Sequence, residues 1–347
     1  MSRMFSAYGL VLSIGFWACS TPIAAQTTAI PADVSSQHQV APAAPMSDLE
    51  TLRFIEPPQR ANFEAIQTWS ARYDILEEYL HTSREDPDTG RPLPATAPTI
   101  QSSEQRVVEG EFHWDRQANK IMASFEATAD TRVSELSEYT DEELKTRKAF
   151  PFLTRERHLV TPTEWTVFSP GTGLRRGDAK MVEREGPNSS LIDPRKFFFE
   201  SNHSTHADGL QRGAIALAEG KTMPLKITSS TTNKSTLWKV RREYTSGGRQ
   251  AEPPLVVETI YDSAVNCLPV RSTITAPTGQ LWEERDWKYE KIANLQIPVW
   301  QKRVQHTLEL PQVVVFSREI TMKDVRINDP IEERYFTEAY LRAVPVD

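Results

Sequence analysis

Cysteine, glycine and long apolar runs are all scarce in this 347-residue chain, and each scarcity excludes a class of protein. The two cysteines, Cys19 and Cys267, cannot form a disulfide framework or a four-ligand zinc site. Fourteen glycines beside 24 prolines disfavour folds built on glycine-rich phosphate loops. No apolar run reaches the ~20 residues that a membrane-spanning helix needs. What remains, 39% hydrophobic and 25% charged residues, is the composition of an ordinary globular protein.

The first 25 residues have the pattern of a secretory signal peptide. Arg3 is the only charged residue before Ala25, and the apolar run Tyr8–Cys19 is followed by small residues. A basic start, a short apolar stretch and a small-residue end predict export to the periplasm or cell envelope, with cleavage after Ala25. The alternative is lipid anchoring at Cys19, although Phe16 occupies a position where that processing site prefers a leucine-like residue.

Composition divides the rest of the chain into a linker and one domain. Residues 26–48 are rich in Ala, Pro, Ser, Thr and Gln, and they contain too few apolar side chains to offset the entropy lost on ordering. We predict a flexible linker there and a single domain over 49–347. Residues 130–208 are unusually charged and are expected to be an insertion in that domain.

Hydrophobic periodicity predicts one helix and three strands at the start of the domain. Apolar residues three and four apart predict an amphipathic helix over 59–69. Alternation from Ala71 to Tyr79 then predicts a half-buried strand. Residues 85–98 hold four prolines and must form a loop, and 107–114 with 120–127 predict a hairpin.

Capping residues predict two further helices. Thr140, with a glutamate three residues later, forms a capping box for a helix over 141–148. Asp208 is expected to cap a helix over 209–219, which Gly220 ends.

Strands dominate the remaining sequence. A strand around Trp165 is expected over 157–168, and short strands and turns over 175–193. Short turns join most of the later segments, which favours an antiparallel meander because parallel neighbours need longer crossovers. A last helical turn near Asp329 is expected to be anchored by Phe336. The seven later strands are predicted at 225–231, 236–245, 255–261, 270–276, 281–289, 297–308 and 313–326.

The order of these elements resembles the LolA/LolB-like exported lipoprotein carriers, especially the diverged planctomycete-type versions. The resemblance covers roughly residues 59–337 and begins with a helix leading into a long strand. Its motifs are short and common in antiparallel sheets, so each is weak alone. They are Tyr261-Asp262, Leu268-Pro269-Val270, Trp282 with Trp287 and Tyr289, and Ile297-Pro298-Val299.

The resemblance implies an α+β, mostly β fold, in which a strongly curved antiparallel sheet forms an incomplete barrel with covering helices. It also implies an apolar cavity, which well-studied members use to hold lipoprotein acyl chains. A long twisted sheet tends to curl, and its inner face needs a cover or a ligand. The candidate ligand-lining residues are Tyr73, Ile75, Trp287, Tyr289 and Phe316. Arg72 lies in the region of the family's lid-holding arginine, but no motif around it supports that role.

His203, His206 and Asp208 are the one set that resembles metal ligands. Two imidazoles and a carboxylate within six positions suit a divalent transition metal if they lie on a helix. The polar residues between the histidines favour a loop, and Asp208 is better explained as a helix cap. We therefore expect no metal site and no cofactor.

No catalytic residue is expected either. The segment Ser169–Gly173 lacks the Gly-Lys-Ser/Thr ending of a phosphate loop, and its ordinary interpretation is a tight turn. Adjacent strand residues face opposite sides, so Glu283 and Glu284 cannot act as a pair. The glutamate pairs at 142–143 and 332–333 are explained by helix solvation.

Basic residues give the middle of the chain a local positive charge without making it a nucleic-acid-binding protein. The whole chain has a net charge of −7, whereas a nucleic-acid-binding domain is strongly basic. Salt-bridged surface is the ordinary interpretation, and contact with anionic headgroups is the alternative. The residues are Arg155, Arg157, Arg175, Arg176, Arg184, Arg195 and Lys196.

Three hypotheses of function follow. The leading one is an exported, non-enzymatic protein that binds a hydrophobic ligand, a lipid or lipoprotein acyl chain, in the curved sheet. The second is an envelope protein–protein interaction or sensory module of the same fold. The third is a hydrolase, which requires His158, His203 or His306 to lie within hydrogen-bond reach of both a serine and a carboxylate.

Overall fold

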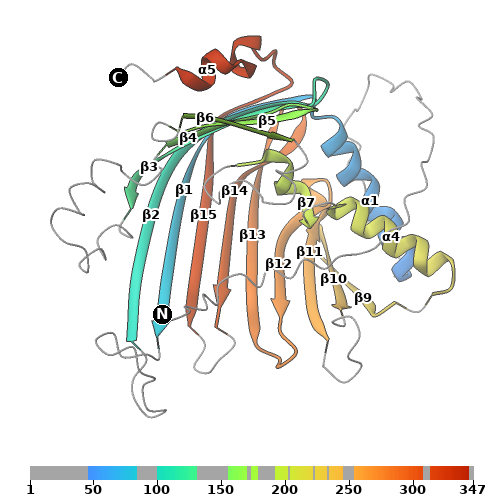
Figure 1. Ribbon diagram of the computed structural model, residues 1–347. Helices are drawn as coiled ribbons and strands as arrows, with labels where there is room; N and C mark the ends of the chain where they lie inside the picture. Colours follow the sequence, from blue (N-terminus) through green and yellow to red (C-terminus); the bar gives the residue numbers. More distant parts are fainter. Residues whose placement is uncertain are drawn as a thin grey trace. The chain divides into compact units, whose positions relative to one another are not determined.

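A single antiparallel sheet of 13 strands organises the part of the chain that the structure describes (Figure 1). The sheet is strongly curved and does not close, so β6 and β9 are its edges. The predicted mostly-β fold with a curved antiparallel sheet is therefore confirmed. The computed structural model describes residues 46–83, 100–130, 155–169, 173–178, 192–201, 204–221, 223–232, 234–244, 254–307 and 313–343, all within the unit Gln39–Asp347.

The strand order is β6-β5-β4-β3-β2-β1-β15-β14-β13-β12-β11-β10-β9, and a small separate pair joins β7 to β8. The antiparallel β1–β15 pair brings the start of the domain beside its end, while the other neighbours in the large sheet are consecutive along the chain. The strands are β1 (Thr68–Ser83), β2 (Ile100–Asp115), β3 (Lys120–Asp130), β4 (Arg155–Val160), β5 (Glu164–Ser169), β6 (Gly173–Asp178), β7 (Phe199–Ser201), β8 (Ser204–Thr205), β9 (Leu225–Thr231), β10 (Thr236–Tyr244), β11 (Leu255–Asp262), β12 (Leu268–Thr275), β13 (Leu281–Ile292), β14 (Leu295–His306) and β15 (Val314–Ile327).

The first helix, α1, spans Asp48–Glu64, so the prediction of a helix over 59–69 was wrong at both ends. It begins earlier because Ser47 and Glu50 form a reciprocal capping box. Pro57 and Pro58 lie inside it, and proline inside a sequence segment normally argues against a helix. At the other end, Trp69 belongs to β1 and is fully buried in the sheet.

The helix α4 spans His206–Ala218 and also begins earlier than predicted. Thr205 is its N-cap, and Asp208 is the third residue of the helix, whose side chain bonds back to the Thr205 N–H in a capping box. The assignment of Asp208 as the cap residue was therefore wrong by three positions. Gly220 ends the helix with a φ of 71°, as predicted. The predicted helix over 141–148 lies outside the described residues.

The remaining predictions for secondary structure are largely confirmed. The predicted hairpin is β2–β3, and all seven predicted strands after residue 225 are present as β9 to β15. The single strand predicted over 157–168 is instead the β4–β5 hairpin, turned where Thr161 N–H donates to the Glu164 carbonyl. Phe336 is buried at the end of the short 3-10 helix η5 (Glu333–Phe336), which α5 (Glu338–Arg342) follows.

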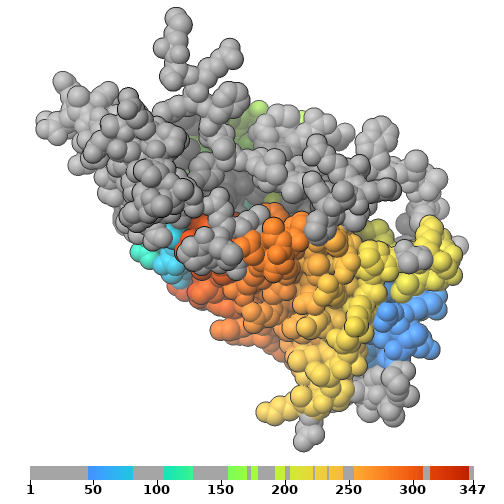
Figure 2. Space-filling model, turned by 90° about the horizontal axis from the view of Figure 1, so that it is seen from below, coloured from blue at the N-terminus to red at the C-terminus, as the bar shows by residue number. Residues whose placement is uncertain are grey.

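Helices pack on both faces of the sheet, and we call the face covered by α1 and α4 the inner face. Leu52 and Ile55 of α1 and Leu210 of α4 pack there against Trp238 and Tyr261 of β10 and β11. The 3-10 helix η3 (Pro194–Phe198) covers the neighbouring strands, and α5 packs on the opposite, outer face of β3 and β4. Figures 1 and 2 both show α1 (blue) beside the edge formed by β9 and β10 (yellow).

In the described ranges, none of the helices combines the length and the apolar character that crossing a membrane requires.

Candidate ligand site on the inner face

The inner face changes from apolar to charged along the strands. A buried apolar row crosses the sheet near the strand ends that are covered by η3 and the helices. Its members are Trp287 of β13, Ile320 of β15, Ile75 of β1 and Val108 of β2. These side chains are at most 5% exposed. This row therefore belongs to the closed core of the domain.

The next row of inner-face side chains, two residues further along each strand, is charged. Its members are direct cross-strand partners on five adjacent strands: Arg285, Arg303, Arg318, Glu77 and Arg106. We call these five residues the arginine row. Like charges directly opposite one another destabilise a sheet, so three successive arginines are costly unless anions neutralise them.

Two buried carboxylates serve the four arginines of the row. Glu283 accepts from Arg285 Nε at 2.5 Å and from Arg303 at 2.6 Å. Glu77 lies 3.5 Å from Arg318 Nε and 3.8 Å from Arg106, which is close enough for ion pairing and too long for good hydrogen bonds. Within the described residues this arrangement has an excess of positive charge.

Burial and neighbouring charges change the pKa values of Arg285, Arg318 and Glu283. Burial lowers the pKa of Arg318 and of Arg285, and nearby Glu77 and Glu283 oppose this only in part. Burial alone would raise the pKa of Glu283, but the Arg285 and Arg303 guanidinium groups outweigh it, so that pKa is lowered.

Two pairs of half-buried apolar side chains lie in the next row beyond the arginines, and Glu283 and Gln305 of the same row separate them. Val257 and Ile274 are cross-strand partners at one end, and Tyr79 and Phe316 are partners at the other, with ring centroids 5.0 Å apart. Val257, Ile274 and Phe316 all retain partly exposed surface. The inner face thus combines accessible apolar surface with an adjacent line of cations.

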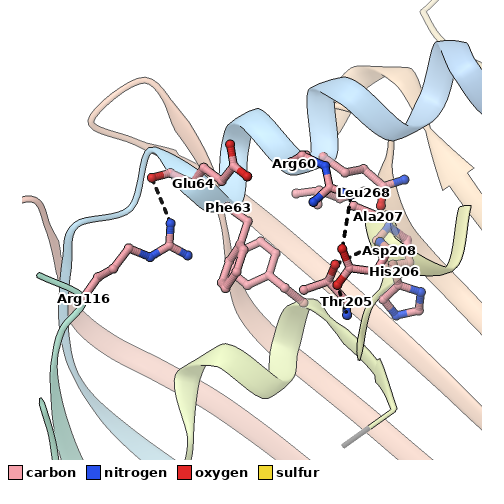
Figure 3. A pocket seen from close by; sticks show the side chains of 12 residues that line it. Arg60, Phe63, Glu64, Arg116, Thr205, His206, Ala207, Asp208 and Leu268 are labelled. Carbon is pink, nitrogen blue, oxygen red and sulfur yellow. Dashed lines mark hydrogen bonds and ion pairs between the residues drawn. The ribbon is translucent and has the colours of Figure 1, made fainter. Parts of the chain in front are cut away.

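A cleft of about 260 Å³ opens between the end of α1, the start of α4 and the sheet (Figure 3). Phe63 lies in its middle, with Arg116 on one side and Arg60 on the other. The Arg116 guanidinium lies 4.3 Å from the Phe63 ring centroid and donates to the Glu64 carbonyl at 2.9 Å. The cleft therefore has an aromatic centre and charged edges.

The two helices are tied together at this cleft. Arg60 of α1 lies 2.5 Å from Glu56 and 3.2 Å from Asp208 of α4. Burial raises the pKa of Asp208, but hydrogen bonds from Thr205 and the charge of Arg60 outweigh it and lower the pKa. A second groove of about 410 Å³ runs between the same helices and includes Ile215, which is 51% exposed.

The candidate ligand-lining residues all lie on the inner face. Tyr73, Ile75, Trp287 and Tyr289 pack in or against the central core cluster, and Phe316 packs on Tyr79 near Arg303. None of the five lines either of the two clefts found among the described residues. Of the five, Phe316 and Tyr289 remain partly exposed, so their role as lining residues stays a prediction.

The structure describes two of the three metal-ligand candidates, and both make other contacts. His206 is buried and lies edge-on to Tyr261 and Trp287, with ring centroids 6.2 and 6.0 Å away. Asp208 bonds to Thr205 and Arg60, as described above, and His203 lies outside the described residues. Among the residues that are described, no group of three or more His, Cys, Asp or Glu side chains is placed to hold a metal ion.

The carboxylate pairs and the basic residues behave mostly as surface ion pairs. Glu283 pairs with Arg303 on the inner face, whereas Glu284 pairs with Arg271, so the two face opposite sides as predicted. Arg155, Arg176 and Arg195 all form ion pairs with nearby carboxylates. Residues 142–143, 184 and 170–172 lie outside the described residues.

His158 does not form the arrangement that a serine hydrolase requires. Its Nε2 lies 3.0 Å from Glu156, and its Nδ1 accepts from the Trp165 indole at 3.1 Å. Ser169 donates to Glu156 at 3.4 Å and has no bond to the imidazole. Because both ring nitrogens are engaged elsewhere, this histidine is not positioned to take a proton from Ser169. His306 is paired with Glu284 at 3.5 Å.

The arginine row is the functional feature that the sequence analysis missed, although a signal for it was present. Alternation places Glu77 on the same face as Ile75, and Arg318 on the same face as Phe316 and Ile320. Arg285 likewise lies two residues before Trp287. Strand alternation alone therefore predicts charged side chains among the lining residues, but the register that aligns them came only from the structure.

These observations define a class of protein: an open, curved antiparallel sheet whose helix-covered inner face carries both apolar and cationic surface. No family model and no curated protein sequence matches the chain.

Solved structures with a partly similar backbone include three from bacteria. A putative outer membrane lipoprotein-sorting protein domain from Vibrio parahaemolyticus is 10% identical, with a TM-score of 0.41, and the match covers 84% of this chain and 99% of that one. A DUF1329 family protein from Desulfovibrio piger is 8% identical (TM-score 0.39, covering 86% and 100%). A LolA superfamily protein from Nitrosomonas europaea is 12% identical (TM-score 0.31, covering 84% and 97%).

Two of these structures carry the lipoprotein-sorting and LolA superfamily names to which the sequence resemblance pointed. At such identities and TM-scores, the similarity identifies no ligand or partner for this chain.

Proposed function

We propose that this chain is an exported, non-enzymatic binding protein of the cell envelope that holds an acyl-chain amphiphile against the inner face of its sheet. The observation that carries the proposal is the presence of half-buried apolar side chains beside the arginine row. Val257, Ile274 and Phe316 point to the helix-covered side of the sheet, yet each keeps accessible surface. Burying such surface under an acyl chain releases about 25 cal/mol per Å² removed from water.

The helices α1 and α4 support the proposal because they are placed to act as a cover. They pack on β10 and β11 through Leu52, Leu210 and Trp238, and the Arg60–Asp208 ion pair links them at the cleft. An ion pair with this much exposure contributes little stability, so separating the helices there is inexpensive. The signal-peptide pattern and the sequence resemblance to lipoprotein carriers agree with this function.

The test compares two variants on one strand. Ile274→Asn places an amide on the inner face of β12, whereas Thr273→Asn changes the neighbouring residue on the outer face. Titration with N-phenyl-1-naphthylamine, a neutral fluorescent probe of apolar sites, is expected to show binding that Ile274→Asn weakens and Thr273→Asn leaves unchanged. The absence of probe binding by the folded parent protein would contradict the proposal.

A second candidate, a protein–protein interaction module, is favoured by the open edge of the sheet. Among the described strands, the edge strand β9 pairs only with β10, and five of its seven residues, Lys226 and Thr228 to Thr231, are exposed. An unpaired edge can accept a strand from another chain. Stoichiometric co-purification with an envelope protein, lost when a proline replaces Ser229, would favour this version.

A further inference from the structure

We propose that the arginine row is a binding site for a phosphate-type oxyanion. This inference deepens the proposed function, on which it rests for the acyl chain, by specifying an amphiphile with an anionic phosphate headgroup. The chemistry of an oxyanion is shared by a lipid headgroup and by free phosphate, and the experiment below distinguishes these two sources.

The first step of the argument is charge. Arg285, Arg303 and Arg318 are direct cross-strand neighbours, and Arg106 completes the row beyond Glu77. Glu283 pairs with Arg285 and Arg303, and Glu77 lies beside Arg318, so in the described part of the chain these three guanidinium groups share two carboxylates.

The second step is unused hydrogen-bonding capacity. The Nε atoms of Arg303 and Arg318 are buried and have no hydrogen-bond partner among the described residues. Buried polar groups in a folded protein normally have partners, so these atoms indicate that a ligand or ion completes the site.

The third step is access. The side chains of Arg285 and Arg303 remain 31% and 35% exposed, whereas those of Arg318 and Arg106 are 17% and 5% exposed. The row is therefore open at the β13–β14 end and closed at the β2 end. An oxyanion entering at Arg303 meets several guanidinium donors, whose planar fork suits phosphate oxygens.

The fourth step connects the anion to the acyl chain. Phe316 lies in the row next to the arginines, and its ring centroid is 5.7 Å from the Arg303 guanidinium carbon. Ile274 lies beside Glu283, which in turn bonds Arg303. A headgroup at Arg303 therefore places attached acyl chains over the half-buried apolar side chains rather than in the closed core.

The experiment measures binding of three probes to the full chain: dioctanoylglycerol, dioctanoyl phosphatidylglycerol and inorganic phosphate. The first two share their acyl chains and differ in the anionic headgroup. Arg303→Gln is the test variant, because the buried Glu283 still has Arg285 as an ion-pair partner after the substitution. Arg271→Gln is the matched control, since Arg271 is 49% exposed on the other face of β12 and pairs with Glu284. Circular dichroism verifies that each variant is folded.

We expect dioctanoyl phosphatidylglycerol to bind more tightly than dioctanoylglycerol. Arg303→Gln should weaken phosphatidylglycerol binding by about tenfold, which is the worth of one charge-assisted hydrogen bond, and leave dioctanoylglycerol binding unchanged. Arg271→Gln should change neither. Inorganic phosphate binding that depends on Arg303, without lipid binding, supports the oxyanion site with free phosphate as its source, and contradicts the acyl-chain function.

Two outcomes overturn the inference. Equal binding of both lipids, unchanged in Arg303→Gln and without phosphate binding, refutes the oxyanion site while leaving the proposed function intact. Failure of all three probes to bind the folded parent protein refutes both.

Discussion

At the scale of single residues, Gly110 in the middle of β2 is required by the close approach of Tyr73. A Cβ at this position would lie 2.2 Å from the Tyr73 ring and 2.4 Å from the Ser124 carbonyl, to which the Tyr73 hydroxyl donates. A glycine inside a strand often marks such an approach. We predict that Gly110→Ala lowers the free energy of unfolding by about 3 kcal/mol, the upper range for overpacking.

Urea denaturation measures this effect, and Gly177→Ala in β6 is its control. A Cβ at Gly177 would make only an ordinary contact, 3.4 Å from Trp165. A Gly110→Ala protein as stable as the parent would show that the Tyr73 ring is not held against this strand.

Cys267 illustrates how burial makes a thiol inert. It is 2% exposed, and burial, aided by the nearby Asp262 carboxylate, raises its pKa to about 12. The thiolate is the reactive form, so the folded protein should leave this residue unmodified. In a Cys19→Ser background, we expect no reaction with iodoacetamide at pH 8 until urea unfolds the chain. Rapid labelling of the folded protein would contradict this account.

His158 makes stability depend on pH in a defined direction. Burial lowers its pKa in the folded protein, although Glu156 opposes the shift. The unfolded chain, with an ordinary pKa near 6.5, therefore takes up the proton first as the pH falls. The free energy of unfolding should decrease between pH 7 and pH 5. The variant His158→Gln should flatten this part of the profile, and an unchanged slope would show that His158 is not its source.

At the scale of elements, Asn62 anchors α1 to the sheet. Its amide donates to the Gln296 carbonyl at 2.8 Å, and its Oδ1 accepts from the Gln296 N–H at 2.8 Å and from Asn266 at 3.0 Å. Asn62→Ala leaves these buried groups without partners. We predict a loss of about 3 kcal/mol in urea unfolding, and no comparable loss for Arg53→Ala on the exposed face of α1. Equal effects of both variants would contradict the anchoring role.

The elements also show which parts of the fold the sequence could predict. Strands β9 to β15 were found because alternation and short turns are local signals that agree with the tertiary structure. The start of α1 was misplaced because Pro57 and Pro58 argue against a helix there, and the start of α4 because Asp208 competed with Thr205 as the cap. The β4–β5 hairpin was missed although Pro162 in its turn argues against a continuous strand.

At the scale of the whole sheet, the sequence predicted curvature and helical cover but not the charge on the inner face. Alternation assigned Tyr73 and Ile75 to this face, and the same rule applied to Glu77 and Arg318. What alternation cannot supply is register, which aligns Arg285, Arg303 and Arg318 on adjacent strands. The sequence analysis therefore named only apolar lining residues, and the structure shows a line of cations beside them.

Native mass spectrometry of the protein purified from its own cell envelope tests the central claim most directly. The account predicts discrete adducts with the masses of acyl-chain amphiphiles on the parent protein and on Thr273→Asn, and their loss from Ile274→Asn. The account would be contradicted if the folded parent protein showed only the mass of the polypeptide and gained no adduct when incubated with dioctanoyl phosphatidylglycerol.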